Sequence, residues 1–455
     1  MKFNHTLKIV TLLVLLGTMS CKKYLDVKSD DKLVVPKTLQ DLQGLLDDAG
    51  IMNLRTTPSL GESSADDYFW LPATYQSQPI TIQQMYTWIP VDFTFGNDWN
   101  LAYQAIYNSN LSLELLNGVE RNGANALEWD NVKGSALFYR SFYFLSLMAQ
   151  FAKAYNETTA GSDLGIVLKL NSDFAETSKR ASVADCYSQL IADLELALPL
   201  LPNRPLITTR PSKVAVYALL ARAYLYKGDY ANALKAADEA LKLQADLMNY
   251  NADASISNLT ANVPFRKFNK ETIFYTEMGT NITLHLTTRA RIDSNLYASY
   301  HTSDLRKKAF FRLVNGYQQF KGSYAANATT LFSGLAVDEV LLTRAESYAY
   351  LGQVDLAMAD LNELLKSRWD KAAVYLPLVA NDKAMALQLV RTERRKELLM
   401  RNLRWMDVKR WNSEGAGIVL KRKVNGAEVL LQPNAAYYAL PIPKDIILAS
   451  GIPQN

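Results

Sequence analysis

Cys21 is the side chain whose chemistry the sequence defines most closely. A basic start at Lys2 and a short apolar run, Ile9–Leu16, precede it, and the small residues Gly17 and Ser20 lead into the thiol. The run is far shorter than the about 20 residues that a membrane-spanning helix needs, and this layout is typical of a secretory signal. A cysteine at this point forms the lipobox of bacterial lipoproteins, in which the thiol is alkylated with a diacylglycerol and the chain is cut before the cysteine.

We therefore predict a signal peptide over residues 1–20 and a lipid-attached Cys21, so that acyl chains hold the protein at the membrane. The alternative is an ordinary signal peptide with an incidental cysteine. The other cysteine, Cys186, falls in a helical stretch, where a lone thiol acts as a small apolar group. A mature chain with these two cysteines has no disulfide framework available to it.

The usual motifs of metal and nucleophile chemistry do not occur in the sequence. There are only three histidines, and there is no HExxH, no paired CxxC, no GxSxG and no phosphate-binding glycine loop. The net charge of +4 is too small to indicate nucleic-acid binding. We predict a protein that is not an enzyme and that takes no cofactor, metal or nucleic acid. A carboxylate glycosidase is the enzymatic alternative, since two carboxylates can meet from distant positions.

Residues 61–96 combine aromatic rings with carboxylates outside any helical pattern. Sugar rings present flat apolar faces and a rim of hydroxyl groups, so a protein that binds them needs aromatic platforms beside carboxylates or amides. A long insertion at 250–335 offers a second such mixture. The predicted ligand-binding residues are Asp67, Trp70, Tyr75, Tyr86 and Trp88 in the first segment and Arg289, Tyr297 and Tyr300 in the second, with Asp66, Arg291 and His301 beside them.

Trp70 and Trp88 carry the most specific expectation of this set. No helical period assigns them to a core, and a soluble domain rarely leaves large apolar patches bare unless they are used. We expect one or both rings to be part-exposed in a shallow groove near Asp67. The alternative is that the rings hold a long loop against a helical base, in which case the site lies in the 285–320 insertion.

Helical periodicity dominates the remainder of the chain. Two stretches, 213–241 and 337–368, share the spacing of a tetratricopeptide repeat, in which small residues let two antiparallel helices approach closely. The repeated positions are Ala221, Tyr224, Gly228 and Ala233 in the first stretch and Ala345, Tyr348, Gly352 and Ala357 in the second. Near the C-terminus, Asn425-Gly426 between two apolar runs predicts the turn of a β-hairpin.

These patterns predict a mainly α fold. We expect a tetratricopeptide-repeat-like α-α superhelix of about four helix pairs, formed as one domain over residues 21–455. Long irregular insertions at about 61–96 and 250–335 lie over this helical base, and a small β-hairpin follows near the C-terminus.

The segment RTERRKELLMRNLRWMDVKRW, residues 391–411, is rich in charge. We interpret it as helix in which the charges pair at i,i+3 and i,i+4 while Trp405 and Trp411 pack inward. Catalysis or anion binding by its charged side chains is the alternative.

Taken in order, these pieces resemble the SusD/RagB family of outer-membrane lipoproteins of Bacteroidetes. CKKYLDV is similar to the family's acylated start, WNLAYQAIYNSN and GSALFYRSFYFLSLMAQFAKAY to its first repeat helices, and LPIPKDIILASGIPQN to its end. The resemblance covers nearly the whole chain. One departure is Met400-Arg401-Asn402, which stands where the family usually has a glutamate-glycine pair.

The resemblance implies a lipoprotein on the outside of the outer membrane. Such a protein captures oligosaccharide or glycan nutrients and delivers them to a partner TonB-dependent transporter, a SusC-like barrel that it covers. The same role with peptide ligands, as in the RagB branch, is one alternative, and a tetratricopeptide scaffold for protein partners is another. Aromatic platforms favour glycan, whereas backbone-pairing edges and charged pockets favour peptide.

Substitution of Cys21 by serine tests the predicted anchor. Because serine cannot replace the acylated thiol, we expect Cys21→Ser to leave the membrane fraction or to keep its signal peptide. Cell fractionation and the mass of the mature chain measure the two outcomes, and Cys186→Ser, which keeps Cys21, is the matched control. A Cys21→Ser chain that is processed and membrane-bound like the wild type would show that the lipobox prediction is wrong.

Overall fold

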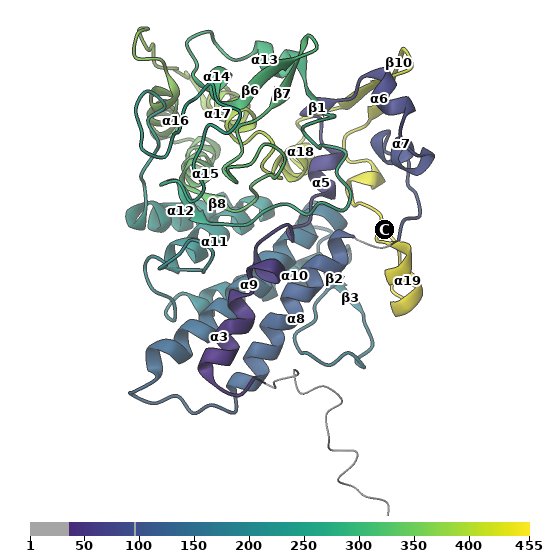
Figure 1. Cartoon of the computed structure of the whole chain (residues 1–455), viewed down its shortest axis with the longest axis vertical. Coiled ribbons are helices and arrows are strands. Elements are labelled where there is room, and N and C mark those ends of the chain that lie inside the picture. Colours follow the sequence, from purple (N-terminus) through teal and green to yellow (C-terminus); the bar gives the residue numbers. More distant parts are fainter. Residues whose placement is uncertain (1–35, 95–96) are drawn as a thin grey trace, which may run out of the picture. The chain divides into compact units, whose positions relative to one another are not determined.

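The structure is a computed structural model that describes residues 36–94 and 97–455. The predicted signal peptide, the lipid attachment at Cys21 and the membrane anchor lie outside the described residues. Residues 39–455 cluster into one unit, whose course is traced in colour in Figure 1. Within the described ranges, no helix is both long and apolar enough to cross a bilayer.

Long antiparallel helices form the base of this unit. α8 (Asp98–Leu116) packs along α9 (Ala126–Phe151), which packs in turn against α10 (Val183–Ala197). α3 (Leu39–Asp47) lies against α8 and α9, as Figure 1 shows. α9 is apolar on most of its circumference because other helices surround it, which is the pattern of a core helix rather than a surface helix.

Two helical hairpins follow the predicted repeats. Gly228 and Gly352 join their helices with φ of +77° and +79°, a left-handed conformation that favours glycine. The small residues of the two repeats, Ala221 and Ala345 among them, are buried between the helices. The hairpins predicted at 213–241 and 337–368 are therefore confirmed. Their helices are α11 (Lys213–Lys227), α12 (Tyr230–Leu243), α15 (Val337–Tyr350) and α16 (Val354–Arg368).

The segment 61–96 is less irregular than predicted. It contains short helices and one short strand, and none of these elements exceeds seven residues. Such elements span two turns or fewer, so a helical period has no room to show in the sequence. The elements of this region are α4 (Ala49–Met52), α5 (Leu60–Ser64), β1 (Tyr68–Phe69), α6 (Pro72–Gln76) and α7 (Ile80–Tyr86).

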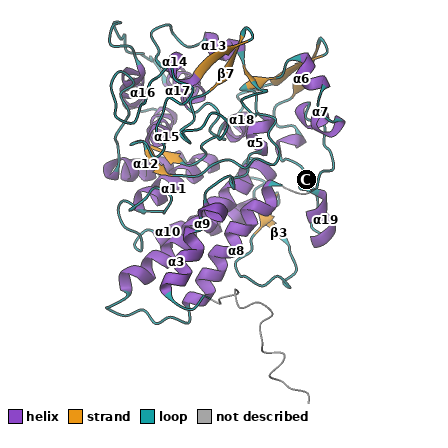
Figure 2. Cartoon of the chain, in the orientation of Figure 1, coloured by secondary structure: helices purple, strands orange, loops and turns teal. Residues whose placement is uncertain are grey.

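The 250–335 insertion is made of short strands and helices joined by loops, as predicted. β1 pairs antiparallel with β5, which sets Tyr68 opposite Ile292 and joins the insertion to the 61–96 segment. Figure 2 shows the strand pair that contains β7 at the opposite end of the unit from α8 and α3. The elements are β4 (Thr272–Phe274), β5 (Arg291–Ile292), α13 (Ser294–Ala298), α14 (Arg306–Phe310), β6 (Phe311–Val314), β7 (Tyr317–Phe320) and β8 (Leu335–Ala336), with β6 paired to β7 and β4 to β8.

The C-terminal part returns across the unit and contains the predicted β-hairpin. Asn425 and Gly426 both have positive φ, +50° and +85°, as a two-residue hairpin turn of this kind requires. The hairpin and the mainly helical fold are therefore confirmed. The elements are α17 (Lys383–Glu397), α18 (Arg404–Ser413), β9 (Leu420–Val424), β10 (Ala427–Leu431), the 3₁₀ helix η1 (Ala436–Tyr438) and α19 (Lys444–Ser450); earlier in the chain β2 (Leu164–Val167) pairs with β3 (Arg180–Ser182).

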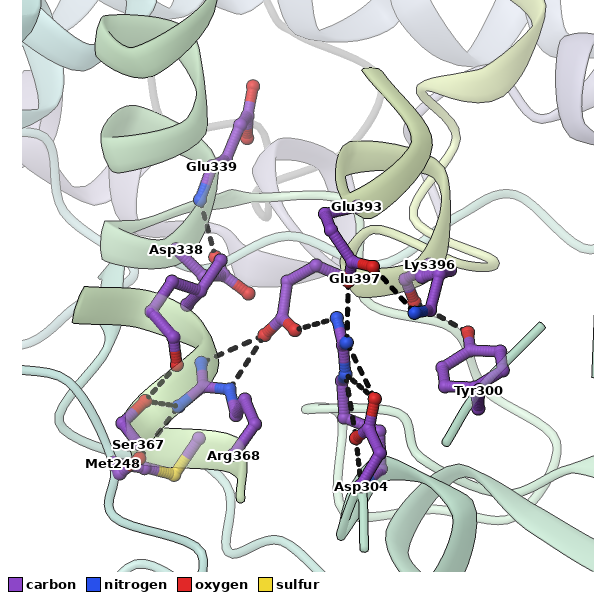
Figure 3. Close-up of polar contacts among 12 residues, drawn as sticks. Met248, Tyr300, Asp304, Asp338, Glu339, Ser367, Arg368, Glu393, Lys396 and Glu397 are labelled. Atoms are coloured by element: carbon purple, nitrogen blue, oxygen red, sulfur yellow. Dashed lines mark hydrogen bonds and ion pairs between the residues drawn. The ribbon is translucent and has the colours of Figure 1, made fainter. Parts of the chain in front are cut away.

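A buried network of charges fastens the insertion to the C-terminal helices (Figure 3). Glu397 on α17 accepts hydrogen bonds from Arg306 of the insertion at 3.0 Å and from Arg368 at the end of α16 at 2.9 Å. Arg368 also pairs with Glu271 at 2.9 Å, and Arg306 pairs with Asp304 at 2.7 Å. All five side chains are buried, so each charge depends on its partners rather than on water.

Removal of one charge from this network tests its contribution to stability. Because Glu397→Gln leaves two buried guanidinium groups short of a partner, we expect a loss of about 3–5 kcal/mol in the free energy of unfolding. Urea unfolding followed by circular dichroism measures it. The control is Asp130→Asn in the solvent-exposed pair with Arg121, which should change stability much less. A Glu397→Gln protein as stable as this control would contradict the assigned role.

Candidate functional site

The expectation that Trp70 or Trp88 is part-exposed is wrong. Their exposed fractions are 3% and 6%, and Tyr86 is fully buried. Trp70 stacks on Tyr86 with ring centroids 4.4 Å apart, and its indole N–H donates to the carbonyl of Leu284 at 2.8 Å. The indole N–H of Trp88 donates to the carbonyl of Ser64 at 2.9 Å. These rings therefore hold the loop against the core and offer no free face to a ligand.

Arg422 of the β9–β10 hairpin explains why these rings turn inward. Its buried guanidinium lies 4.1 Å from the ring centroid of Tyr86, 4.8 Å from that of Trp88 and 5.1 Å from that of Tyr68. It also donates to the carbonyl of Ala65 at 2.8 Å. A desolvated cation among aromatic rings gains from each of them, so one arginine from far along the chain holds the rings of Tyr68, Tyr86 and Trp88 together.

The other predicted ligand-binding residues fall into two groups. Asp67 is 1% exposed and accepts from Arg395 Nε at 2.9 Å, so it holds an arginine in place instead of facing solvent. Tyr300 is also buried and donates its hydroxyl to the carbonyl of Lys396 at 2.7 Å. The predicted residues that stay partly exposed are Tyr75, Arg289 and Tyr297.

A groove of about 420 Å³ opens beside this segment, where α13 of the insertion meets α17 and α18. On α17, Gln388, Arg391 and Arg395 follow one another at i, i+3 and i+7, so they share a helix face. On α18, Arg404 and Trp411 are seven residues apart and also share a face. The lining residues include Asp293, Asn295 and Ser299 from the insertion, Gln388, Arg391, Thr392, Arg395 and Lys396 from α17, Arg404 and Trp411 from α18, and Ile418.

Two aspartates that follow α5, Asp66 and Asp67, fix two of the groove arginines. Asp66 accepts from Arg404 Nε at 2.7 Å and from Arg404 Nη2 at 3.0 Å, a bidentate pair. Arg395 Nη2 lies 3.2 Å from the same carboxylate, and Arg395 Nε donates to Asp67. Burial raises the pKa of Asp66, but Arg395 and Arg404 more than offset it and hold that pKa below its usual range. Both guanidinium groups are therefore held by ionised or hydrogen-bonded carboxylates.

The third groove arginine, Arg391, is fixed from the opposite side. Its Nε donates to Glu346 at 2.8 Å and its Nη2 to Glu414 at 2.5 Å. Trp411 lies beneath it: the centroid of the indole ring is 5.2 Å from the guanidinium of Arg391 and 5.7 Å from that of Arg404. The indole N–H donates to Glu346 at 2.9 Å. The prediction that Trp405 and Trp411 pack inward is confirmed, since both are almost fully buried.

Comparison with known proteins decides the family. A model described as "Starch-binding associating with outer membrane" matches residues 23–225, and a model described as "SusD family" matches residues 248–445. The chain belongs to the SusD/RagB family. The resemblance that the sequence motifs carry is thus confirmed.

Several SusD-family proteins are similar to this chain. The SusD-like protein P2 of Formosa agariphila is 29% identical over 179 residues, which are 35% of this chain and 32% of that protein, so the match spans about a third of that relative's length. A structure described as a putative sugar binding protein from Bacteroides vulgatus has a TM-score of 0.74 at 23% identity and covers 93% of this chain and 99% of its own. A SusD superfamily protein from Bacteroides thetaiotaomicron has a TM-score of 0.73 at 20% identity, with coverages of 92% and 99%.

Met400-Arg401-Asn402, which stands where the SusD family usually has a glutamate-glycine pair, has an unusual backbone conformation beside the groove. Met400 and Asn402 both adopt positive φ, +58° and +63°. The backbone N–H of Asn402 donates to Glu62 of α5 at 2.8 Å, and its side chain donates to the carbonyl of Pro58 at 2.6 Å. Asparagine tolerates the left-handed region better than most residues. Here its two hydrogen bonds position α5, and Asp66 and Asp67 follow that helix in the chain.

The sequence predicts only a structural role for the charged residues of 391–411, several of which line the groove. Some charges of 391–411 do pair locally, such as Lys396 with Glu393 at 2.6 Å, but the groove arginines pair with distant carboxylates. The signal that could have identified them is the shared helix face of Gln388, Arg391 and Arg395. Among the residues that the structure describes, no group of three or more histidine, cysteine, aspartate or glutamate side chains could hold a metal ion. The absence of a cofactor stays a prediction.

Glu62 gives the site a testable dependence on pH. Burial, and then the charges of Asp67 and Asp66, raise the pKa of Glu62 to about 8 from its ordinary 4.5. The folded chain therefore keeps this acid protonated between about pH 4.5 and 8, while the unfolded chain releases the proton, so this group lowers stability as pH rises through that window. Glu62→Gln removes the ionisable group, and its melting temperature relative to wild type should rise from pH 5 to pH 8.5.

The exposed Glu157→Gln variant is the control for this measurement. Its melting temperature should differ from that of the wild type by the same small amount at both pH values, because Glu157 is exposed and lies outside the cluster of Glu62, Asp66 and Asp67. A Glu62→Gln difference that stays constant with pH would contradict the raised pKa.

Proposed function

We propose that this SusD-family chain is a non-catalytic cell-surface lipoprotein that binds oligosaccharides and passes them to a TonB-dependent transporter of the outer membrane. The observation that carries the proposal is the groove between α13, α17 and α18, whose polar groups are fixed before any ligand arrives. Membership of a family whose model is described as starch-binding and associating with the outer membrane supports the ligand class and the location. The description of a structural neighbour as a sugar binding protein supports the same class.

The groove suits an oligosaccharide in both chemistry and rigidity. Arginine N–H groups and the side chains of Gln388, Asn295 and Ser299 offer hydrogen bonds to sugar hydroxyl groups. The guanidinium planes above Trp411 are held by carboxylates, so little side-chain freedom is lost when a ligand binds. Tyr297 lies on the helix that forms one wall of the groove, and Tyr75 and Arg289 remain proposed contacts because they are partly exposed.

The proposal has three further parts. Cys21 is the lipid attachment after a signal peptide over residues 1–20, and residues 21–455 act as one domain. The successive antiparallel pairs among α8, α9, α10, α11, α12, α15, α16 and α17 support a tetratricopeptide-like superhelix, which stacks such pairs. Peptide ligands are the second candidate, favoured by the charged lining of the groove.

A variant that fills the groove tests the proposed function. Thr392 lines the groove and is exposed on α17, so Thr392→Trp should occupy the groove while it leaves every arginine–carboxylate pair in place. We expect at least a tenfold loss of oligosaccharide affinity, about 1.4 kcal/mol or more, with an unchanged melting temperature. Calorimetry against a panel of neutral and acidic oligosaccharides measures the affinity, and chromatography of the recovered ligand should show no cleavage.

Lys235→Trp is the matched control, because Lys235 is exposed on α12 and does not line the groove. It should bind like the wild type. Binding that survives Thr392→Trp would place the site elsewhere on the chain. A wild-type protein that binds peptides but no oligosaccharide of the panel would favour the peptide candidate, and cleavage of the ligand would contradict the non-catalytic role.

A further inference from the structure

The three groove arginines share one arrangement of their donors. Arg391, Arg395 and Arg404 each use Nε and Nη2 to hold protein carboxylates. In residues 36–94 and 97–455, none of the three Nη1 groups has a hydrogen-bond partner. The three Nη1 atoms also differ from the Nη2 atoms of Arg394 and Arg401, which are buried and have no hydrogen-bond partner. The groove Nη1 atoms are not buried in this way. The Nη1 groups therefore reach solvent along one groove, two of them from α17 and one from α18.

From this arrangement we propose that the groove selects oligosaccharides that carry carboxylate or sulfate groups. The inference rests on the proposed function and specifies its ligand class. An anionic oxygen on a sugar accepts charge-assisted hydrogen bonds from arginine, which are shorter and roughly twice as strong as hydrogen bonds between neutral groups. A planar guanidinium also matches the geometry of a carboxylate or sulfate better than a lysine ammonium does.

The remaining charges around the groove agree with this class. Lys396 adds a fourth cationic side chain to the lining. Asp293 is the carboxylate of that lining, and its Oδ1 is already occupied, since it accepts from the backbone N–H of Leu296 at 2.7 Å. The groove therefore presents many donors and few free acceptors. A sugar hydroxyl group can also accept from these donors, but it carries no charge and so lacks the ion pairing that a carboxylate or sulfate adds.

The carboxylates behind the arginines set how strongly a simple ion can bind. Asp66, Asp67, Glu346 and Glu414 neutralise much of the positive charge, so an isolated sulfate or acetate ion meets little net attraction. An acidic oligosaccharide presents several anionic groups at once and adds the contacts of its sugar rings. Recognition therefore depends on the fixed direction of the Nη1 donors along the groove, and a free anion should compete only weakly.

The experiment compares matched pairs of ligands that differ only in charge. The pairs are oligogalacturonates and their carboxyl-reduced forms, and sulfated galactan oligosaccharides and their desulfated forms. In calorimetry with the wild-type chain, we expect at least one acidic member to bind tenfold or more tightly than its neutral partner. A rise in NaCl from 50 to 500 mM should weaken the acidic ligand several-fold and leave the neutral one nearly unchanged, since screening acts on the charged ligand.

Arg391→Gln tests the assignment at residue level. The variant removes one Nη1 donor and should reduce the preference for the acidic ligand at least fivefold, while Arg121→Gln, in an exposed pair remote from the groove residues in the sequence, should retain it. If Arg391→Gln is misfolded by its melting curve, the salt dependence of the wild type decides the question without it.

Equal affinity for both members of every pair would overturn the anionic preference, and a preference that Arg391→Gln retains in full would overturn its assignment to the groove arginines. Both outcomes leave oligosaccharide binding intact. Failure of the wild type to bind any saccharide of either kind would overturn the proposed function, and the preference with it. Tight binding of free sulfate or acetate at millimolar concentration would also contradict the inference, because it would assign the groove to a simple ion.

Discussion

Glu397 receives one arginine from the insertion and one from the end of α16, and this shared carboxylate sets the position of α17. Neither arginine has water to replace a lost partner, because both are buried. The insertion, the second helical hairpin and the C-terminal helices thus depend on one another through charges that are satisfied only when all three are in place. The geometry of the groove depends on the same arrangement.

α17 uses its two sides for two purposes. Glu393 and Glu397 face the buried network, while Arg391 and Arg395 line the groove. The two pairs are offset by two residues, which is a rotation of about 200° around an α-helix, so they point in nearly opposite directions. The buried side fixes the helix, and the fixed helix aims the arginines of the open side. A binding surface can therefore be rigid although it consists of long side chains.

The parts of the fold that could be predicted from the sequence are those whose information is local. The turns at Gly228 and Gly352 and the Asn425-Gly426 hairpin each depend on residues within a few positions of themselves, and all three are present. The inward direction of Trp70 could not be predicted, since it follows from the carbonyl of Leu284 and from ring stacking within a cluster that Arg422 closes.

The candidate site also combines features that depend on nearby residues with features that depend on distant ones. The shared face of Arg391 and Arg395 is visible in the sequence, but which way that face points is decided by Glu397 and its distant partners. Asp67 is predicted to bind ligand, yet its carboxylate is buried and accepts from Arg395, so it supports a residue of the groove instead of lining it. A residue that lines a groove differs from one that supports it in how far its side chain is buried. That burial is a property of the folded chain, so the sequence alone does not show it.

The groove is lined by residues between positions 293 and 418, and one of its arginines is held by Asp66, far earlier in the chain. A chain with such non-local contacts folds more slowly than one whose contacts are close in sequence. The groove cannot form before Asp66 and Trp411, near opposite ends of the described residues, are both in place. A chain that ends before α18 lacks Arg404 and the indole ring beneath Arg391, so truncation removes the groove before it removes the long helices of the base.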